Sequence, residues 1–212
     1  MKKNNGKMKE GEFWIPYWGA IVMKTVVSNA FKDKLLTEGK KTKEDFRNQL
    51  AGMIEKEFLY KDYDDWFFPE LLPLLNLYQD KYLNSWGGKL DDIKTPFAIT
   101  ASNLWINYQK SGEFNPRHGH SGDLSFVVYL KIPEELKKEN EEKKLIHNNL
   151  GTGTIKFHFG ENLPFSVFEH EELPEEANIF IFPAWLQHSV SPFFSDVERI
   201  SASGNIWLQR NE

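Results

Sequence analysis

The second half of the chain is a series of short apolar or alternating segments, and this pattern limits the folds it can adopt. The segments are separated by Gly, Pro and Asn and cover residues 97–100, 104–108, 124–132, 154–159, 178–182 and 199–208. Many short strands with turn residues between them are typical of β-sandwiches and β-barrels. We therefore expect a mainly β fold for this half.

The first half has a more helical character. Aromatic and β-branched residues at 13–27 predict one or two strands. A cap at Ser28 followed by apolar residues predicts a helix over 28–39, and the capping-box pattern at Thr42 predicts another over 42–58. A further helix is expected from about 69 to 82. Helices therefore flank the predicted β core.

These patterns define the expected domain organisation. Residues 1–11 are polar and carry nothing to bury, so we expect a disordered tail. Residues 12–212 then form a single domain, in which 12–94 support a core at 95–208. Residues 133–149 are a charged insertion, expected to be a solvated helix or loop, with a lid over the site as the lesser alternative.

Composition excludes several kinds of chemistry. The chain of 212 residues has no cysteine, so His, Asp and Glu are the strong metal ligands that remain. The absence of cysteine is compatible with the cytoplasm, where we expect the protein. The net charge of -5 argues against nucleic acid as a partner, and no run of about eighteen apolar residues predicts a membrane span.

Two of the six histidines are one residue apart in an extended segment. His118 and His120 share one face there, because strand side chains alternate with period two. His188 begins a distant strand after a turn and can complete a facial set of three metal ligands. The other histidines are expected to be surface or structural residues: His147, His158 and His170.

Arg199 is the second residue that indicates a ligand. It enters the last predicted strand with Ser201 on the same face. An arginine and a hydroxyl so placed can bind a carboxylate through a bidentate fork and one further hydrogen bond. Together with its spacing of eleven residues from His188, this favours a carboxylate-binding role over a surface ion pair.

Taken in order, these motifs resemble the 2-oxoglutarate–Fe(II) oxygenase superfamily, and within it a bacterial and phage branch distantly similar to prolyl and aspartyl hydroxylases. The resemblance covers about residues 97–208. It is carried by Trp105-Ile106-Asn107, Gly112, Asn115, His118-Gly119-His120, Leu124-Ser125 with Tyr129-Leu130, Phe182-Pro183 with Trp185, His188-Ser189-Val190, and Arg199-Ile200-Ser201 with Asn205.

The resemblance implies a double-stranded β-helix, the jelly roll of cupin-like barrels, and an enzyme that uses Fe(II), 2-oxoglutarate and O2 to hydroxylate an unknown small molecule or peptide. It implies that His118 and His188 bind iron and that Arg199 with Ser201 holds the distal carboxylate of 2-oxoglutarate. It also places Tyr129 and Asn107 in the barrel, where they could bind the cosubstrate.

The sequence departs from the superfamily at one ligand, because His120 stands where a carboxylate is usual. Three readings remain open: His120 is the third ligand, Asp123 folds back to supply a carboxylate, or solvent fills the position. We favour His120, because it shares a face with His118 whereas Asp123 does not.

Two other functions compete with the hydroxylase. A cupin-like metalloenzyme without 2-oxoglutarate would use the same histidines and would leave Arg199 without a role. A non-enzymatic jelly-roll binding module would use exposed aromatic residues such as Trp185 and would leave the histidines without one. The oligomeric state cannot be read from the sequence.

Overall fold

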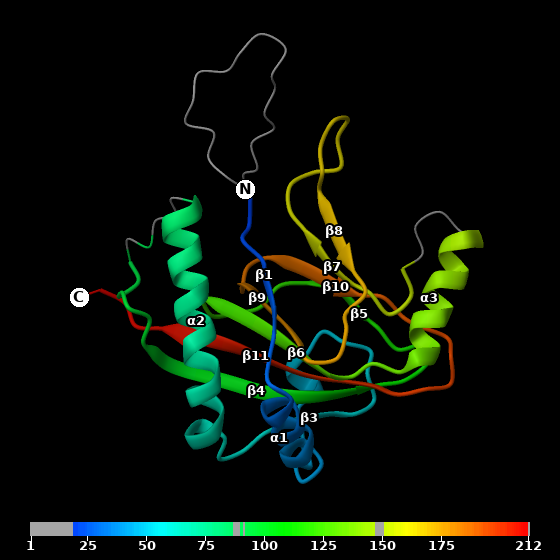
Figure 1. Cartoon of the computed structure of the whole chain (residues 1–212), viewed down its shortest axis with the longest axis horizontal. Helices are drawn as coiled ribbons and strands as arrows, with labels where there is room; N and C mark the ends of the chain where they lie inside the picture. Colours follow the sequence, from blue (N-terminus) through cyan, green and yellow to red (C-terminus); the bar gives the residue numbers. More distant parts are fainter. Residues whose placement is uncertain (1–18, 87–89, 91, 147–150, 212) are drawn as a thin grey trace.

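The computed structural model describes residues 19–86, 90, 92–146 and 151–211, and it consists of antiparallel sheets flanked by helices (Figure 1). Within this part, the larger sheet has seven strands in the order β1-β9-β6-β11-β4-β3-β2, and the smaller has four in the order β5-β10-β7-β8.

The elements have the following bounds. The strands are β1 (Met23–Val26), β2 (Glu44–Asp45), β3 (Glu57–Leu59), β4 (Ile99–Gln109), β5 (Asn115–His118), β6 (Leu124–Lys131), β7 (Ile155–His158), β8 (Glu169–Glu172), β9 (Asn178–Pro183), β10 (Gln187–Val190) and β11 (Arg199–Leu208). The helices are α1 (Asn29–Gly39), α2 (Asp64–Trp86) and α3 (Glu134–Ile146), with a 3-10 turn at Arg47–Gln49.

The chain crosses repeatedly between the two sheets. After β4 in the larger sheet, the chain forms β5 in the smaller sheet and β6 in the larger. It then forms β7 and β8 in the smaller sheet, β9 in the larger, β10 in the smaller and β11 in the larger. Two antiparallel sheets connected in this way form a jelly roll. The expected fold class, mainly β with flanking helices, is therefore confirmed.

Strand β6 shows how the two layers of the core are built. Phe126 and Val128 belong to the cluster that packs against the helices, whereas Val127 and Tyr129 belong to the cluster between the sheets. Alternate side chains of a strand point to opposite faces. Because both faces are covered, nearly every residue of β6 is buried, and the strand reads as one apolar run.

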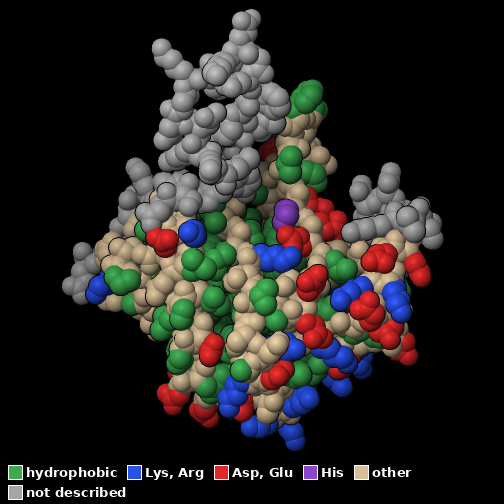
Figure 2. Space-filling model, viewed as in Figure 1, with side chains coloured by type: hydrophobic (Ala, Val, Ile, Leu, Met, Phe, Trp, Pro, Cys, Tyr) green, Lys and Arg blue, Asp and Glu red, His purple; other side chains and the backbone are tan. Residues whose placement is uncertain are grey.

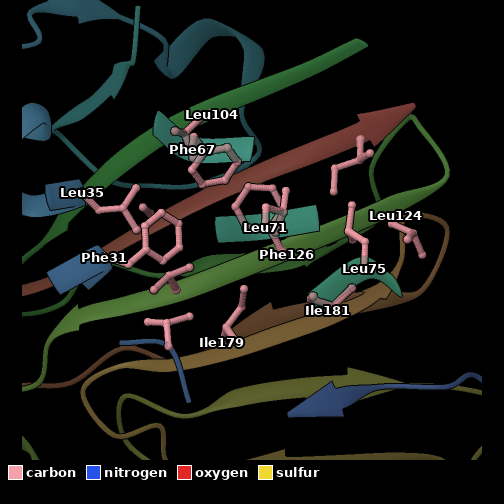
Figure 3. Packing of buried hydrophobic residues seen from close by; sticks show 14 of the residues in the cluster. Phe31, Leu35, Phe67, Leu71, Leu75, Leu104, Leu124, Phe126, Ile179 and Ile181 are labelled. Atoms are coloured by element: carbon pink, nitrogen blue, oxygen red, sulfur yellow. The ribbon is translucent and has the colours of Figure 1, made fainter. Parts of the chain in front are cut away.

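Helix α2 supplies most of the outer layer over the larger sheet. Phe67, Leu71 and Leu75 recur every four residues, are at most 1% exposed, and face the sheet (Figure 3). The ring of Phe67 lies 5.4 Å from that of Phe126 on β6, measured between centroids. Burial of each such side chain contributes about 1.5–3 kcal/mol.

The predicted helix over 28–39 is confirmed as α1. Ser28 caps it, since its hydroxyl oxygen accepts a hydrogen bond of 3.1 Å from the backbone N–H of Phe31. The predicted strand region ahead of it contains β1, which pairs with β9 at the edge of the larger sheet. The tail at 1–11 lies outside the described residues.

The predicted helix over 42–58 is wrong, because the segment forms β2, a 3-10 turn and β3. The hydroxyl of Thr42 donates to the carbonyl of Leu59 instead of capping a helix, and Asp45 binds the backbone and side chain of Arg47. Strand β3 then pairs with β4. Sheet pairing with a distant strand outweighed the local helical pattern.

Other boundaries also differ from the expectation. Helix α2 begins at Asp64, five residues before the predicted start, and takes Pro69 and Pro73 into its length. The predicted strands 97–100 and 104–108 are one strand, β4. Strands β5 and β8 were not predicted, because polar residues dominate both and no apolar alternation marks them.

The charged insertion forms α3, on the opposite side of the molecule from α2 (Figure 1). It is less solvated than expected, since Leu136 is fully buried and Asn140 is 1% exposed. The carboxylate of Glu139 accepts hydrogen bonds from the backbone N–H groups of Phe194 and Ser195. Polar contacts thus fasten the helix to the segment before β11, and a lid role stays a prediction.

Acidic and basic side chains are intermixed on the face of the molecule shown in Figure 2, without a large patch of one sign. In the described part of the chain, no helix combines the length and the apolar character needed to cross a membrane.

Candidate active site

Three histidines predicted to lie together do so at one end of the space between the sheets. His118 ends β5, His120 follows two residues later, and His188 is in β10 directly opposite His118 in the strand register. Their ring centroids are 4.3 to 4.9 Å apart, and one ring nitrogen from each lies within 4.8 Å of those of the other two.

Local backbone contacts fix the orientation of two of these rings. Nδ1 of His118 lies 2.7 Å from the carbonyl oxygen of Pro116, and Nδ1 of His188 lies 3.0 Å from that of Leu186. A carbonyl can only accept, so each Nδ1 carries the proton and each Nε2 keeps its lone pair. Nε2 of His188 is 3.2 Å from Nε2 of His120, so these two ring nitrogens converge.

The surroundings keep these rings neutral at physiological pH. Burial, reinforced by His118, lowers the pKa of His188 to about 3 and that of His120 to about 4. Burial also lowers the pKa of His118. A neutral imidazole has a lone pair to donate, so the cluster is ready to bind a metal ion.

Gly119 allows the two-histidine segment to approach the turn before β10. A Cβ at this position would lie 3.0 Å from the side-chain nitrogen of Gln187 and 3.4 Å from the carbonyl oxygen of Trp185. The backbone N–H of His120 also donates to the carbonyl of Ala184, at 2.8 Å. A side chain at Gly119 would therefore require the end of the Gln187 side chain to shift by a small amount.

Asp123, the alternative ligand considered from the sequence, lies elsewhere. Its carboxylate accepts hydrogen bonds from Leu208 N, at 2.8 Å, and from the guanidinium of Arg210, at 2.5 Å. The metal-binding cluster found among the described residues contains no carboxylate.

The remaining histidines do not join the cluster. His158 is buried and bonds to the hydroxyl of Ser189 at 3.1 Å, with Glu169 3.3 Å from its other nitrogen, and a structural role stays a prediction. His170 is exposed and bonds to Glu172, as expected for a surface residue. His147 lies outside the described residues.

A row of polar side chains crosses the larger sheet and lines the same cavity as the histidines. Ser201 on β11 is opposite Tyr129 on β6 and opposite Asn107 on β4. Paired residues of neighbouring strands point to the same face, and these side chains point between the sheets. The amide nitrogen of Asn107 lies 3.3 Å from the Ser201 hydroxyl. Asn107 Oδ1 and the Tyr129 hydroxyl are buried, and neither has a hydrogen-bond partner within the described ranges.

Arg199 lies deeper in the same space. It is 3% exposed, and its guanidinium donates to the carbonyl of Gly153 at 2.7 Å and to Oε1 of Gln109. Its Nε has no partner, and no acid forms an ion pair with it in the described part of the chain. Burial lowers the pKa of Arg199 and raises that of Tyr129 to about 12.

All of the predicted site residues line one cavity between the sheets. Its free volume is about 40 Å³, room for one or two water molecules. Sequence reasoning missed two of its polar lining residues, Gln109 and Glu57. Alternation from Asn107 along β4 could have indicated Gln109, whereas Glu57 reaches the cavity only through the pairing of β3 with β4.

A jelly roll with a convergent histidine cluster and a buried arginine in the same cavity is the arrangement expected of a non-haem iron oxygenase. A family model described as "Putative 2OG-Fe(II) oxygenase" matches residues 103–205, which include every residue predicted for the site. This segment belongs to that family. The chain is a 2-oxoglutarate-dependent dioxygenase, and its cofactors are Fe(II) and 2-oxoglutarate, with O2 as the oxidant typical of the family.

Solved structures share the fold at low sequence identity. A prolyl-4-hydroxylase from Pseudomonas putida matches with a TM-score of 0.54 and 13% identity, over 90% of this chain and 93% of that one. A prolyl hydroxylase from Trichoplax adhaerens, in complex with a peptide fragment of a hypoxia inducible factor, matches with a TM-score of 0.51 and 13% identity, over 89% and 83%. A search of curated proteins found no match.

Proposed function

We propose that the protein is an Fe(II)- and 2-oxoglutarate-dependent hydroxylase in which His118, His120 and His188 hold the metal. The observation that carries this proposal is the convergence of three neutral imidazoles beside a buried arginine without an acidic partner. Its substrate is a small molecule or a peptide.

The histidine cluster fits a metal of this kind. Three neutral nitrogen donors on one side of an ion leave other positions for a bidentate cosubstrate and O2. The carbonyls of Pro116 and Leu186 hold the ring tautomers that donate through Nε2. The rings of Phe157 and Phe182, at 6.3 and 4.9 Å from that of His188, cover one side of the cluster and exclude water.

Arg199 fits the distal carboxylate of 2-oxoglutarate. A buried guanidinium without a counter-ion is costly, and a bound carboxylate would compensate its charge. Ser201, two residues further on the same face of β11, can add a hydroxyl donor, and Tyr129 and Asn107 face the same space. Since Gln109 now accepts from Arg199 and the cavity is small, we expect Gln109 to move aside when the cosubstrate binds.

When bound, Fe(II) and 2-oxoglutarate supply an oxidative decarboxylation to succinate and CO2 that couples O2 to C–H hydroxylation. The residues described here would orient the cosubstrate and keep bulk water away. Peptide is one substrate class to consider, because the Trichoplax adhaerens protein with the same fold was solved with a bound peptide.

The alternatives raised by the sequence have less support. The family match favours 2-oxoglutarate dependence over a cupin-like metalloenzyme that would not use it. A binding module without catalytic function gives no role to three convergent histidines, which are costly to bury unless they have partners.

An anaerobic titration with Fe(II), with and without 2-oxoglutarate, tests the proposal. We expect Fe(II) to bind to the wild type and 2-oxoglutarate to add a metal-to-ligand charge-transfer band in the visible range. The His188→Ala variant should lose both. If Fe(II) binds and 2-oxoglutarate changes nothing, the proposed cosubstrate is wrong; if His188→Ala keeps full Fe(II) affinity, the proposed ligands are wrong.

A further inference from the structure

Glu57 is a buried carboxylate in the cavity that the proposed chemistry does not use. It begins β3 and is opposite Asn107 on β4. It therefore adds a fourth residue, on β3, to the polar row that crosses β4, β11 and β6. It is 1% exposed, and its Oε2 is buried without a hydrogen-bond partner among the described residues. A buried acid of this kind is costly unless something binds to it.

A second acceptor lies next to it. The side-chain oxygen of Asn115, at the start of β5, is also buried and has no hydrogen-bond partner in the part of the chain that the structure describes. A Cβ built on Gly52 would lie 2.2 Å from this oxygen and 3.3 Å from Oε1 of Glu57. Both side chains therefore lie against Gly52, and the oxygen of Asn115 occupies the place that a Cβ of this residue would take.

The charges around Glu57 favour a cation. Burial is the largest cause that raises the pKa of Glu57 to about 7, and the neighbouring Glu113 raises it further. Arg47 lowers this pKa, but its guanidinium is bound to the carboxylate of Asp45. A protonated nitrogen would compensate the negative charge and donate to both acceptors, whereas a second anion would be repelled.

Glu57 is opposite Asn107, which faces the cosubstrate space, but it is separated from Arg199 and Ser201, the residues assigned to the distal carboxylate. Strands β3 and β11 lie on either side of β4, so Glu57 and Ser201 are two strand spacings apart, roughly 10 Å. A dicarboxylate is suited to the Arg199 end of the cavity and not to the Glu57 end. The second reactant, the molecule to be oxidised, is the one that Glu57 can recognise.

The cavity wall next to Glu57, on the side away from Arg199 in the strand register, suits such a group. Trp105 precedes Asn107 by two residues on β4 and lines the same cavity, with its ring 5.9 Å from that of His120. An indole attracts cations and packs well against the methylene groups that carry an amine or guanidinium.

We propose that Glu57, with Oδ1 of Asn115, forms a subsite for a protonated amine or guanidinium group of the substrate. This inference rests on the proposed function, since it assigns the substrate class of that same site. Glu57 comes from outside the segment that the family model matches. The N-terminal part of the chain thus contributes specificity to a catalytic site built by the rest.

Pairs of ligands that match in carbon skeleton, one with and one without the cationic group, test the subsite. We would compare Nα-acetyl-lysine amide with Nα-acetyl-norleucine amide, and Nα-acetyl-arginine amide with Nα-acetyl-citrulline amide, by ligand-observed NMR. A charge-assisted hydrogen bond contributes about 1.5–3 kcal/mol, so the cations should bind about tenfold to a hundredfold more tightly. In Glu57→Gln the preference should fall to about threefold or less.

Two controls separate this role from a structural one. Glu57→Gln has nearly the same shape and removes an unpaired buried charge, so it should unfold at the same or a higher temperature than wild type. Glu55→Gln removes a carboxylate two residues away whose side chain is 75% exposed, and it should keep the full preference for cations.

The possible results are distinguishable. Equal binding of cationic and neutral ligands to the wild type, or an unchanged preference in Glu57→Gln, would overturn the subsite. The NMR measurement needs neither metal nor cosubstrate, so it decides the inference even if 2-oxoglutarate fails to bind. A titration of Fe(II) and 2-oxoglutarate on the same samples shows separately whether the proposed function stands.

Discussion

Arg199→Ala should weaken binding of 2-oxoglutarate while leaving Fe(II) affinity nearly unchanged. The guanidinium is 3% exposed, and it is the charge proposed to meet the distal carboxylate. Truncating one partner of a buried charge pair costs about 2–5 kcal/mol, much of it from leaving the other charge unpaired. At 1.4 kcal/mol for each factor of ten, this raises the Kd for 2-oxoglutarate by about 30-fold to about 4,000-fold.

Arg199→Lys should give a smaller loss, because lysine keeps the charge but not the planar fork. A matched control is Arg210→Ala, which removes an exposed arginine that binds Asp123 outside the cavity. It should leave the Kd for 2-oxoglutarate within about twofold of wild type, since exposed ion pairs contribute little.

The measurement is an anaerobic titration of the charge-transfer band, with Fe(II) affinity determined separately for each variant and folding checked by circular dichroism. A folded Arg199→Ala variant with wild-type affinity for 2-oxoglutarate would show that the carboxylate anchor lies elsewhere. Equal losses of metal and cosubstrate affinity would show that Arg199 acts through the histidines.

Other predictions concern stability. Folding lowers the pKa values of His120 and His188 far below the usual 6.5, so the unfolded chain binds more protons than the folded chain between about pH 6.5 and 4. The metal-free protein should therefore lose stability as pH falls through this window. His188→Gln should lessen the slope of Tm against pH. Ser28→Ala should lower the free energy of unfolding by about 1 kcal/mol in urea, whereas the exposed Thr37→Ala should change it by less than about 0.5 kcal/mol. Phe67→Ala should lower the free energy of unfolding by about 3–5 kcal/mol in the same assay. A smaller loss would show that α2 and the sheet move together to fill the space left by the ring.

Several features could be predicted because the signal is local. Ser28 and the apolar residues after it define α1 within a few residues of sequence, and the apolar run of β6 is visible in that strand alone. The pairing of His118 with His120 on one face follows from the period of a strand. Arg199 and Ser201 share a face for the same reason, and the structure keeps both side chains in the cavity.

Other features depend on which segments meet. Residues 42–58 carry a capping pattern and apolar residues at helical spacing, yet β3 forms because its backbone groups find partners on β4. Strand β5 has little apolar content, and only its pairing with β10 makes it a strand. Local propensity amounts to a few tenths of a kcal/mol for each residue, which tertiary pairing easily outweighs.

By itself, then, the sequence determined the strand-rich second half, the first helix and the set of residues able to bind a metal and a carboxylate. The tertiary structure decided that Asp123 turns away to Arg210, that Gln109 holds Arg199, and that Glu57 enters the cavity. The physical reason is that alternation along a strand assigns each side chain to a face, whereas the neighbours of that face come from strands far apart in the chain.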